Sequence, residues 1–204
     1  MVNYVMDFGV DLLHRYSDED IEELVRRNPG LQFERTPEGR LLVSPPNGWL
    51  GGRRDAALVL ALGNWNVRSG NGGTVLGSSA GFTLPDGALF APDASWLNAE
   101  RFAQLRARQP LDKFAPASPN LVFEIVSPTD RINAVRRKIE TYVRNGVTCA
   151  VLIDPERHLV EISTQDRLHT PASDASRLTI PLDLLAGALA PFELELTELF
   201  TAAT

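Results

Sequence analysis

The sequence contains the apolar run LVFEIV at residues 121–126, in which Glu124 is the one charged side chain. Apolar residues on both sides of Glu124 predict a strand that is buried on both faces of a sheet. A carboxylate in such a strand is costly unless it is paired, hydrogen-bonded or bound to a metal ion. Glu124 therefore marks either a sheet end that borders a cleft, or an ion pair with one of the chain's many arginines.

A second carboxylate, Asp93, directly follows a proline in the segment APDASWL at residues 91–97. A proline at this place suits an edge strand or the start of a strand. Taken alone, Asp93 is better interpreted as a turn or capping residue. Taken with Glu124 on a neighbouring strand, it would form a hard oxygen site, which Mg²⁺ favours because waters and a substrate phosphate complete its octahedron.

A helix is predicted over residues 131–145, because apolar side chains recur at helical spacing and Gly146 follows. At roughly 100° per residue, Lys138 lies on the margin of that apolar face, from which it can extend into a cleft beside the sheet. The chain has 20 basic residues, of which only Lys113 and Lys138 are lysines. Lysine is thus the unusual choice here, and its compact ammonium approaches a water or phosphate oxygen as a point charge.

Helices and strands alternate along the rest of the chain. We expect helices over 17–28, 50–68 and 99–108, a hairpin of 31–35 with 40–44, strands at 74–76, 81–84, 91–97, 147–153 and 159–163, and further short segments at 181–189 and 194–200. This order predicts an α/β fold with a mixed sheet and helices on its faces. No linker rich in Pro, Gly or Ser divides the chain, so one domain over residues 1–204 is expected.

The formal net charge of −6 argues against a protein that coats nucleic acid through bulk electrostatics. Positive charge is concentrated in residues 131–144, a pattern that fits a solvated helix face as well as a local basic groove. There is no apolar run long enough to span a membrane. Residues 1–7 lack the basic and apolar regions of a signal peptide. We therefore expect a cytoplasmic protein without membrane association.

The order of Pro92-Asp93, Glu124 and a following lysine resembles the PD-(D/E)XK nuclease superfamily. Several segments resemble more closely its Uma group of restriction-endonuclease-like proteins: 81–87 (GFTLPDG), 91–96 (APDASW), 119–128 (PNLVFEIVSP), 138–146 (KIETYVRNG) and 152–155 (LIDP). Their order and spacing cover most of the chain from about residue 34 to residue 200. The resemblance implies a restriction-endonuclease-like fold, a mixed β-sheet flanked by helices with the two carboxylates on adjacent strands.

The resemblance also implies hydrolysis of DNA phosphodiester bonds with Mg²⁺, or Mn²⁺ in its place, often by a homodimer. Asp93 would be the central metal ligand and Glu124 the second. Lys138 would orient the attacking water or stabilise charge on the phosphoryl group. The lysine departs from the superfamily's simplest pattern, because Val126 stands two positions after Glu124. The Uma group looks similar here, with its lysine displaced to the following helix.

Two residues and one rival function stay open at this point. Glu34 lies where the superfamily can carry a further acidic site residue, although we favour a solvent-facing strand residue. Tyr142 borders the site or packs in the core, and we favour the core. The rival function is a catalytically silent nuclease-fold protein that acts as a nucleic-acid-binding or assembly module. The negative net charge and the missing in-strand lysine both leave room for it.

Overall fold

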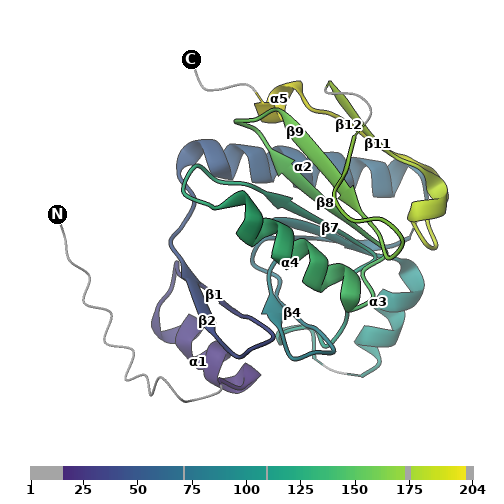
Figure 1. Cartoon of the computed structure of the whole chain (residues 1–204). Coiled ribbons are helices and arrows are strands. Elements are labelled where there is room, and N and C mark those ends of the chain that lie inside the picture. The colour runs from purple at the N-terminus through teal and green to yellow at the C-terminus, as the bar shows by residue number, and fades with distance from the viewer. Residues whose placement is uncertain (1–15, 71, 109, 173–175, 201–204) are drawn as a thin grey trace.

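The computed structural model describes residues 16–70, 72–108, 110–172 and 176–200 (Figure 1). Residues 1–7, on which the expected location partly rests, lie outside these ranges. The elements in chain order are α1 (Asp18–Arg27), β1 (Gln32–Arg35), β2 (Leu41–Ser44), α2 (Trp49–Arg68), β3 (Thr74–Gly77), β4 (Phe82–Thr83), β5 (Leu89–Phe90), β6 (Ala94–Leu97), α3 (Ala99–Arg106), β7 (Leu121–Ile125), α4 (Ile132–Arg144), β8 (Cys149–Asp154), β9 (Leu159–Ser163), β10 (Thr170–Pro171), β11 (Arg177–Ile180), η1 (Leu182–Leu184), β12 (Phe192–Glu195) and α5 (Thr197–Phe200).

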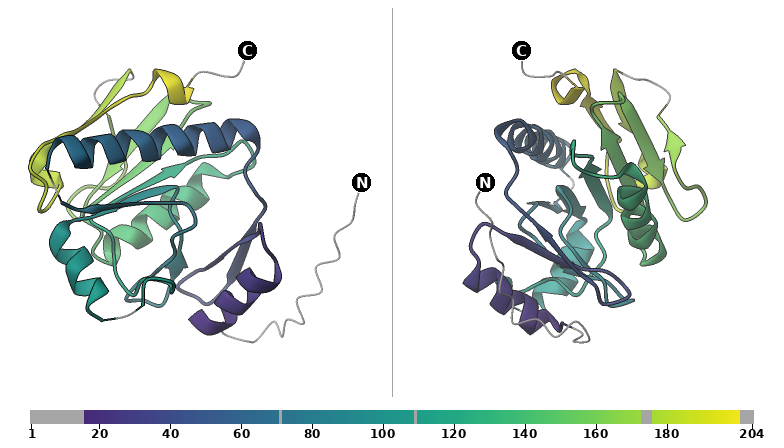
Figure 2. Two further views of the ribbon diagram at one scale, coloured as in Figure 1. Left: turned by 180° about the vertical axis from the view of Figure 1, so that it is seen from behind. Right: turned by 60° about the vertical axis from the view of Figure 1, so that its left-hand side comes forward.

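The main sheet has six strands in the order β10-β9-β8-β7-β6-β3. Strands β7 and β8 are parallel and α4 connects them, whereas the other neighbours in this sheet are antiparallel. A parallel pair needs such a crossover, because a short turn cannot return the chain to the same end of the sheet. Figure 2 shows α2 and α4 on opposite faces of this sheet. The mixed sheet with flanking helices confirms the predicted α/β class.

The pleat of β7 divides the core into two layers. Leu121 and Phe123 pack with α2, while Val122 packs with α4, so alternate side chains of one strand reach opposite faces. Hairpin β11–β12 belongs to the α2 layer through its buried side chains, Leu178, Ile180, Phe192 and Leu194. The buried run at residues 121–126 is therefore the centre of the fold, as its apolar composition predicts.

A second, smaller sheet has the order β2-β1-β5-β4 and carries α1 on one side. The helix begins with a capping box, in which Ser17 and Asp20 bond each other's backbone amides. Figure 1 shows this unit beside α4 and below the main sheet. It matters for the site because β1 carries Glu34.

The predicted helices agree with the structure within about two residues at each end, and hairpin β1–β2 is present. Three features were missed: the two-residue strands β5 and β10, and the hairpin of β11 with β12. The predicted segment at 194–200 combines the end of β12 with α5. Among the described residues, none of the helices has the length and apolar character that a membrane crossing requires.

Candidate active site

Asp93 and Glu124 come from adjacent antiparallel strands. Ala94 on β6 pairs with Phe123 on β7, and one further step in this register brings Asp93 opposite Glu124. Asp93 Oδ2 accepts a hydrogen bond of 2.6 Å from the backbone amide of Ile125. This bond holds the aspartate against β7 at the end of the strand, and leaves Oδ1 as the oxygen that can face a ligand.

Lys138 reaches the same place from α4. Its Nζ lies 2.8 Å from Glu124 Oε1 and 2.8 Å from Glu34 Oε1. The ammonium also lies 5.4 Å from the centre of the Phe90 ring, within the range of a cation–π contact. The structure thus brings together Asp93, Glu124 and Lys138, the three residues singled out in the sequence.

Glu34 is part of this cluster, and the favoured interpretation of a solvent-facing residue was wrong. Its side chain is 9% exposed, and Oε1 also accepts a 2.7 Å bond from the backbone amide of Ala91. The reason is that β1 is an interior strand between β2 and β5, and its sheet lies beside α4. The short segment QFER gives no clear alternation from which this burial could be predicted.

Tyr142 packs in the core, as predicted, and also borders the site. Its ring is fully buried and meets Phe90 edge to face at 5.4 Å. Its hydroxyl donates a 2.9 Å hydrogen bond to Glu124 Oε1. Burial, together with the charge of Glu124, raises the pKa of Tyr142 well above its usual value, so the phenol keeps the proton that it donates.

Asp55 on α2 is an acidic neighbour that the sequence did not reveal. It lines the groove that contains Asp93, and its Oδ2 accepts a 2.7 Å bond from Asn47 Nδ2. Burial raises the pKa of Asp55, and its negative charge adds to the factors that raise the pKa of Asp93. A carboxylate near the start of an amphipathic helix is usually solvated, so no local pattern distinguished this one.

Burial makes ionisation of both strand carboxylates costly. Burial raises the pKa of Asp93 to about 7, although the hydrogen bond from the Ile125 amide acts in the opposite direction and lowers it. Burial also raises the pKa of Glu124 to about 8, which Lys138 opposes and the Asp93 and Glu34 charges reinforce. For Lys138, burial alone would lower the pKa, but the carboxylates of Glu124 and Glu34 raise it above its usual value. Lys138 therefore stays an ammonium ion.

The cluster carries more negative than positive charge. When Asp93, Glu124 and Glu34 are all ionised, three carboxylates share the single ammonium of Lys138. Two negative charges then remain in a poorly solvated place, a situation that favours a divalent cation. In the part of the chain that the structure describes, no three His, Cys, Asp or Glu side chains are already grouped as metal ligands. Two carboxylates with water and phosphate oxygens would suit Mg²⁺ without a third.

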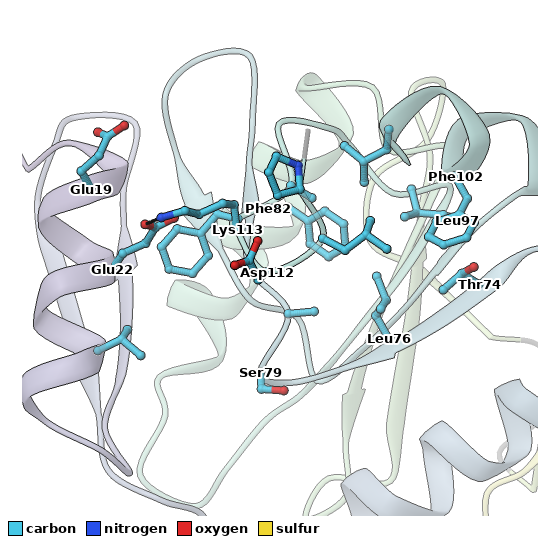
Figure 3. A pocket seen from close by; sticks show the side chains of 18 of the residues that line it. Glu19, Glu22, Thr74, Leu76, Ser79, Phe82, Leu97, Phe102, Asp112 and Lys113 are labelled. Atoms are coloured by element: carbon cyan, nitrogen blue, oxygen red, sulfur yellow. Dashed lines mark hydrogen bonds and ion pairs between the residues drawn. The ribbon is translucent and has the colours of Figure 1, made fainter. Parts of the chain in front are cut away.

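The cluster lies in a groove of about 1430 Å³. Its walls are the β1–β2 hairpin, the start of α2, the loop after β7 and the exposed edge of α4. A second cavity, of about 870 Å³, lies between α1 and the region of α3 (Figure 3). Its lining is largely apolar, and Glu22 on its rim forms an ion pair with Lys113. Since Asp93, Glu124 and Lys138 are absent from that lining, the larger groove is the candidate active site.

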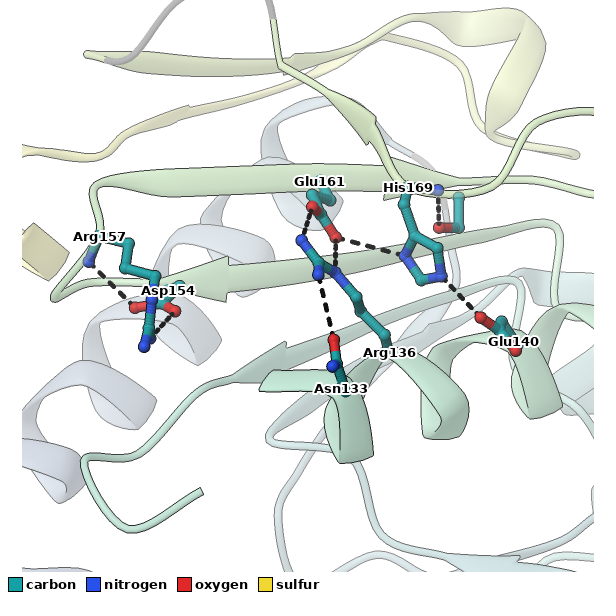
Figure 4. A network of polar contacts seen from close by, with 8 residues as sticks. Asn133, Arg136, Glu140, Asp154, Arg157, Glu161 and His169 are labelled. Carbon is teal, nitrogen blue, oxygen red and sulfur yellow. Dashed lines mark hydrogen bonds and ion pairs between the residues drawn. The ribbon is translucent and has the colours of Figure 1, made fainter. Parts of the chain in front are cut away.

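A separate polar network lies between α4 and strand β9 (Figure 4). Arg136 donates two hydrogen bonds to the carboxylate of Glu161, one of them 3.0 Å long from Nε. The His169 ring lies between Glu140 on α4, at 3.0 Å, and Glu161, at 3.3 Å. These contacts fasten α4 to the main sheet on the side away from Lys138.

The mixed sheet flanked by helices carries an acidic pair on adjacent strands, with a lysine in contact with Glu124, and this is the arrangement expected of a nuclease-like α/β protein. A family model described as "Uma2: Putative restriction endonuclease" matches residues 18–193, and the chain belongs to this Uma2 family. Family membership confirms the resemblance seen in the sequence, and the family's description supports a nuclease.

The fold is similar to that of a crystal structure from Anabaena variabilis, titled as a "putative nuclease belonging to DUF820". The TM-score is 0.65, the sequence identity is 17%, and the match covers 88% of this chain and 96% of the other. At this identity the likeness concerns the fold alone. No curated protein matches the chain.

Proposed function

We propose that this chain is a Mg²⁺-dependent endonuclease that hydrolyses phosphodiester bonds of DNA, with a PD-(D/E)XK type of site. The observation that carries the proposal is the contact of Lys138 Nζ with Glu124 Oε1, at 2.8 Å, beside Asp93 on the neighbouring strand. Three buried carboxylates around one ammonium leave an excess of negative charge, which a divalent cation would neutralise. The family's description supports the nuclease class, and the site chemistry supports the metal.

Asp93 and Glu124 would hold the metal ion, with Mn²⁺ as a substitute for Mg²⁺. Both are carboxylates, the ligand type that these hard cations prefer. Both have a raised pKa, which a bound cation would lower because it stabilises the ionised form. When bound, the ion would polarise the scissile phosphate and lower the pKa of a water molecule. The backbone amide of Ile125 and the hydroxyl of Tyr142 keep the two carboxylates oriented.

Lys138 would act as an electrostatic stabiliser. Because its pKa is raised, it keeps its proton and is unsuited to be the general base. Its ammonium would donate to a phosphoryl oxygen on which negative charge develops during the attack by water. Glu34 gives Lys138 a second carboxylate partner, so the amine keeps its position if Glu124 turns toward a metal ion.

The test is cleavage of supercoiled plasmid with Mg²⁺ or Mn²⁺ by the parent, Asp93→Ala and Lys138→Ala. Lys113→Ala is a matched control, because Lys113 is the other lysine and pairs with Glu22 at the second cavity. We expect nicking or linearisation by the parent and the control, and its loss in the two site variants. If Asp93→Ala loses cleavage and Lys138→Ala keeps it, the metal site would be upheld and Lys138 would have no part in the mechanism.

A thermal shift with Mn²⁺ or Mg²⁺ separates the proposal from the catalytically silent alternative. A metal that binds the folded state raises the melting temperature of the parent but not of Asp93→Ala. If neither metal shifts the parent and the plasmid stays intact, the silent binding or assembly module becomes the better account. A homodimer stays a prediction from the family resemblance, and light scattering after gel filtration tests it.

A further inference from the structure

The groove has arginines on two walls above its acidic floor. Arg137 and Arg144 line it from α4, and both are exposed. Arg40 lines it from the turn of the β1–β2 hairpin, with a side chain that is 76% exposed. Arg137 and Arg144 are seven residues apart, so they lie on one stripe of the helix, about 10.5 Å apart along its axis.

Within the described ranges, these arginines are only weakly neutralised by neighbouring carboxylates. Glu140 lies between Arg137 and Arg144 on α4, but its carboxylate is in contact with His169. Arg144 donates to the neutral hydroxyl of Thr141. Arg40 meets Glu38 at 3.5 Å, and both side chains are largely exposed, so this pair contributes little. The wall therefore offers cationic groups to a ligand.

The overall charge makes such a local attraction necessary. At −6, the chain as a whole repels a polyanion, so a polyanionic ligand must be held by nearby cations that are not paired internally. Guanidinium groups bind phosphate in a bidentate geometry. Arginines beside the carboxylate floor would hold a phosphodiester backbone across the candidate site.

The amides and aromatic rings of the lining are not placed to read bases, so its remaining polar side chains are hydroxyl and charged groups. Its two side-chain amides are already engaged: Gln32 donates to the carbonyls of Ser78 and Ala91, and Asn47 donates to Asp55. The aromatic residues of the lining are Phe33 and Phe90, which are buried, and Phe114, which is half-buried. Base recognition needs free hydrogen-bonding groups, and base stacking needs exposed rings.

We propose that the groove binds the nucleic-acid backbone through Arg137 and Arg144 on one wall and Arg40 on the other, with little dependence on base sequence. This proposal rests on the proposed function, since it names how the same site holds its substrate. It adds that affinity comes from phosphate contacts and that the chain itself discriminates poorly between sequences.

The experiment measures binding of labelled oligonucleotides in EDTA, so that no metal-dependent cleavage takes part. Two duplexes of unrelated sequence are titrated with the parent, with the double variant Arg137→Gln/Arg144→Gln, and with the control Arg68→Gln/Arg108→Gln. The control arginines are exposed and lie outside the groove lining, and both double variants lose the same charge. Thermal unfolding of each variant confirms that it is folded.

We expect the parent to bind both duplexes with dissociation constants within about threefold of each other. Each lost phosphate contact removes about 0.9 from the slope of log K against log salt, so the groove variant should lose about 1.8. At 0.1 M salt this corresponds to a weakening of roughly tenfold per arginine. The control should keep the parent's slope.

Three results would overturn the inference: no binding by the parent, an equal loss in the control, or more than a hundredfold preference for one duplex. The outcome is independent of catalysis. A parent that binds through these arginines and leaves plasmid intact with metal would uphold the phosphate contacts and refute the nuclease. If the parent cleaves plasmid and the double variant Arg137→Gln/Arg144→Gln binds as tightly as the parent, the nuclease would be upheld and the phosphate contacts refuted.

Discussion

Helix α4 lies between two polar clusters that differ in their balance of charge. On one side, Arg136 and His169 face Glu161 and Glu140, so each carboxylate has a cationic or protonatable partner. On the other side, Lys138 forms ion pairs with Glu34 and Glu124, and the carboxylate of Asp93 adds a third negative charge beside them. A balanced network fastens one element to another. A cluster with an excess of negative charge is held together by the surrounding fold, and a bound cation or substrate can neutralise that excess.

Asp93→Asn should cause the largest loss of activity, and it distinguishes most clearly between a functional and a structural role of the two clusters. The amide oxygen can still accept the Ile125 bond, but the ligand charge is lost. We expect metal-dependent plasmid cleavage to fall by at least about 10³-fold. The metal-free melting temperature should stay unchanged or rise, because one buried negative charge has gone. A clear fall in that temperature would mean that Asp93 is structural, like the residues of the other cluster.

Arg136→Met tests the balanced cluster. It leaves Glu161, with a side chain only 5% exposed, without its two guanidinium bonds. We expect a loss of about 2 kcal/mol in the free energy of unfolding, measured by urea denaturation. The neighbouring Arg137→Met should lose less than about 0.5 kcal/mol, since it is exposed. Equal losses would show that the network contributes nothing beyond helix propensity.

The pH dependence of stability tests the unbalanced cluster. The pKa of Asp93 is about 7 in the folded protein and near its ordinary value of 3.8 when unfolded, so the folded state binds the proton more tightly. Stability contributed in this way is present below pH 4 and is lost as the pH rises to about 7. Between pH 5.5 and 8, the metal-free melting temperature should fall by about 4 °C or more.

The Asp93→Asn variant should show a flatter pH profile, and this comparison isolates the contribution of that group. Since protons compete with the cation, the stabilisation by Mn²⁺ should be larger at pH 8 than at pH 6. A thermal shift that is equal at the two pH values would contradict the assigned ligands.

Tyr142→Phe should have the smallest effect. The ring keeps its contact with Phe90, and only the hydroxyl bond to Glu124 is lost. We expect a change in the free energy of unfolding of about 1 kcal/mol or less, and a three- to tenfold loss in cleavage rate. A loss above a hundredfold would assign Tyr142 a direct part in the chemistry, which its burial argues against.

The sequence predicted the parts of the fold and the site that depend on short-range patterns. Helical periodicity predicted α4 and the edge position of Lys138, and the apolar run predicted β7. For Glu34 the family resemblance raised a site role, but the residues alone favoured a solvent-facing position, because its partner Lys138 is far away in sequence and the contact depends on how the small sheet lies beside α4. Asp55 was missed because a carboxylate on an amphipathic helix is usually solvated, and no local pattern shows that this one lines the groove.

Hairpin β11–β12 shows a different kind of miss. Leu178 and Ile180 alternate with polar residues, and so do Phe192 and Leu194, which is the pattern of a half-buried strand. The signal was present but short, and each strand has only four residues. What could not be read from either segment alone was that the two pair with each other across the intervening chain.

The delivery of Lys138 from α4 has a consequence for how such sites are recognised across distant relatives. Val126, two positions after Glu124, packs in the core layer of α4 and also lines the groove, and here the ammonium comes from Lys138 on α4 instead of from this position. A search string that fixes the interval between glutamate and lysine would pass over this chain. A three-dimensional template of one ammonium and two carboxylates would retrieve it, whichever element carries the amine.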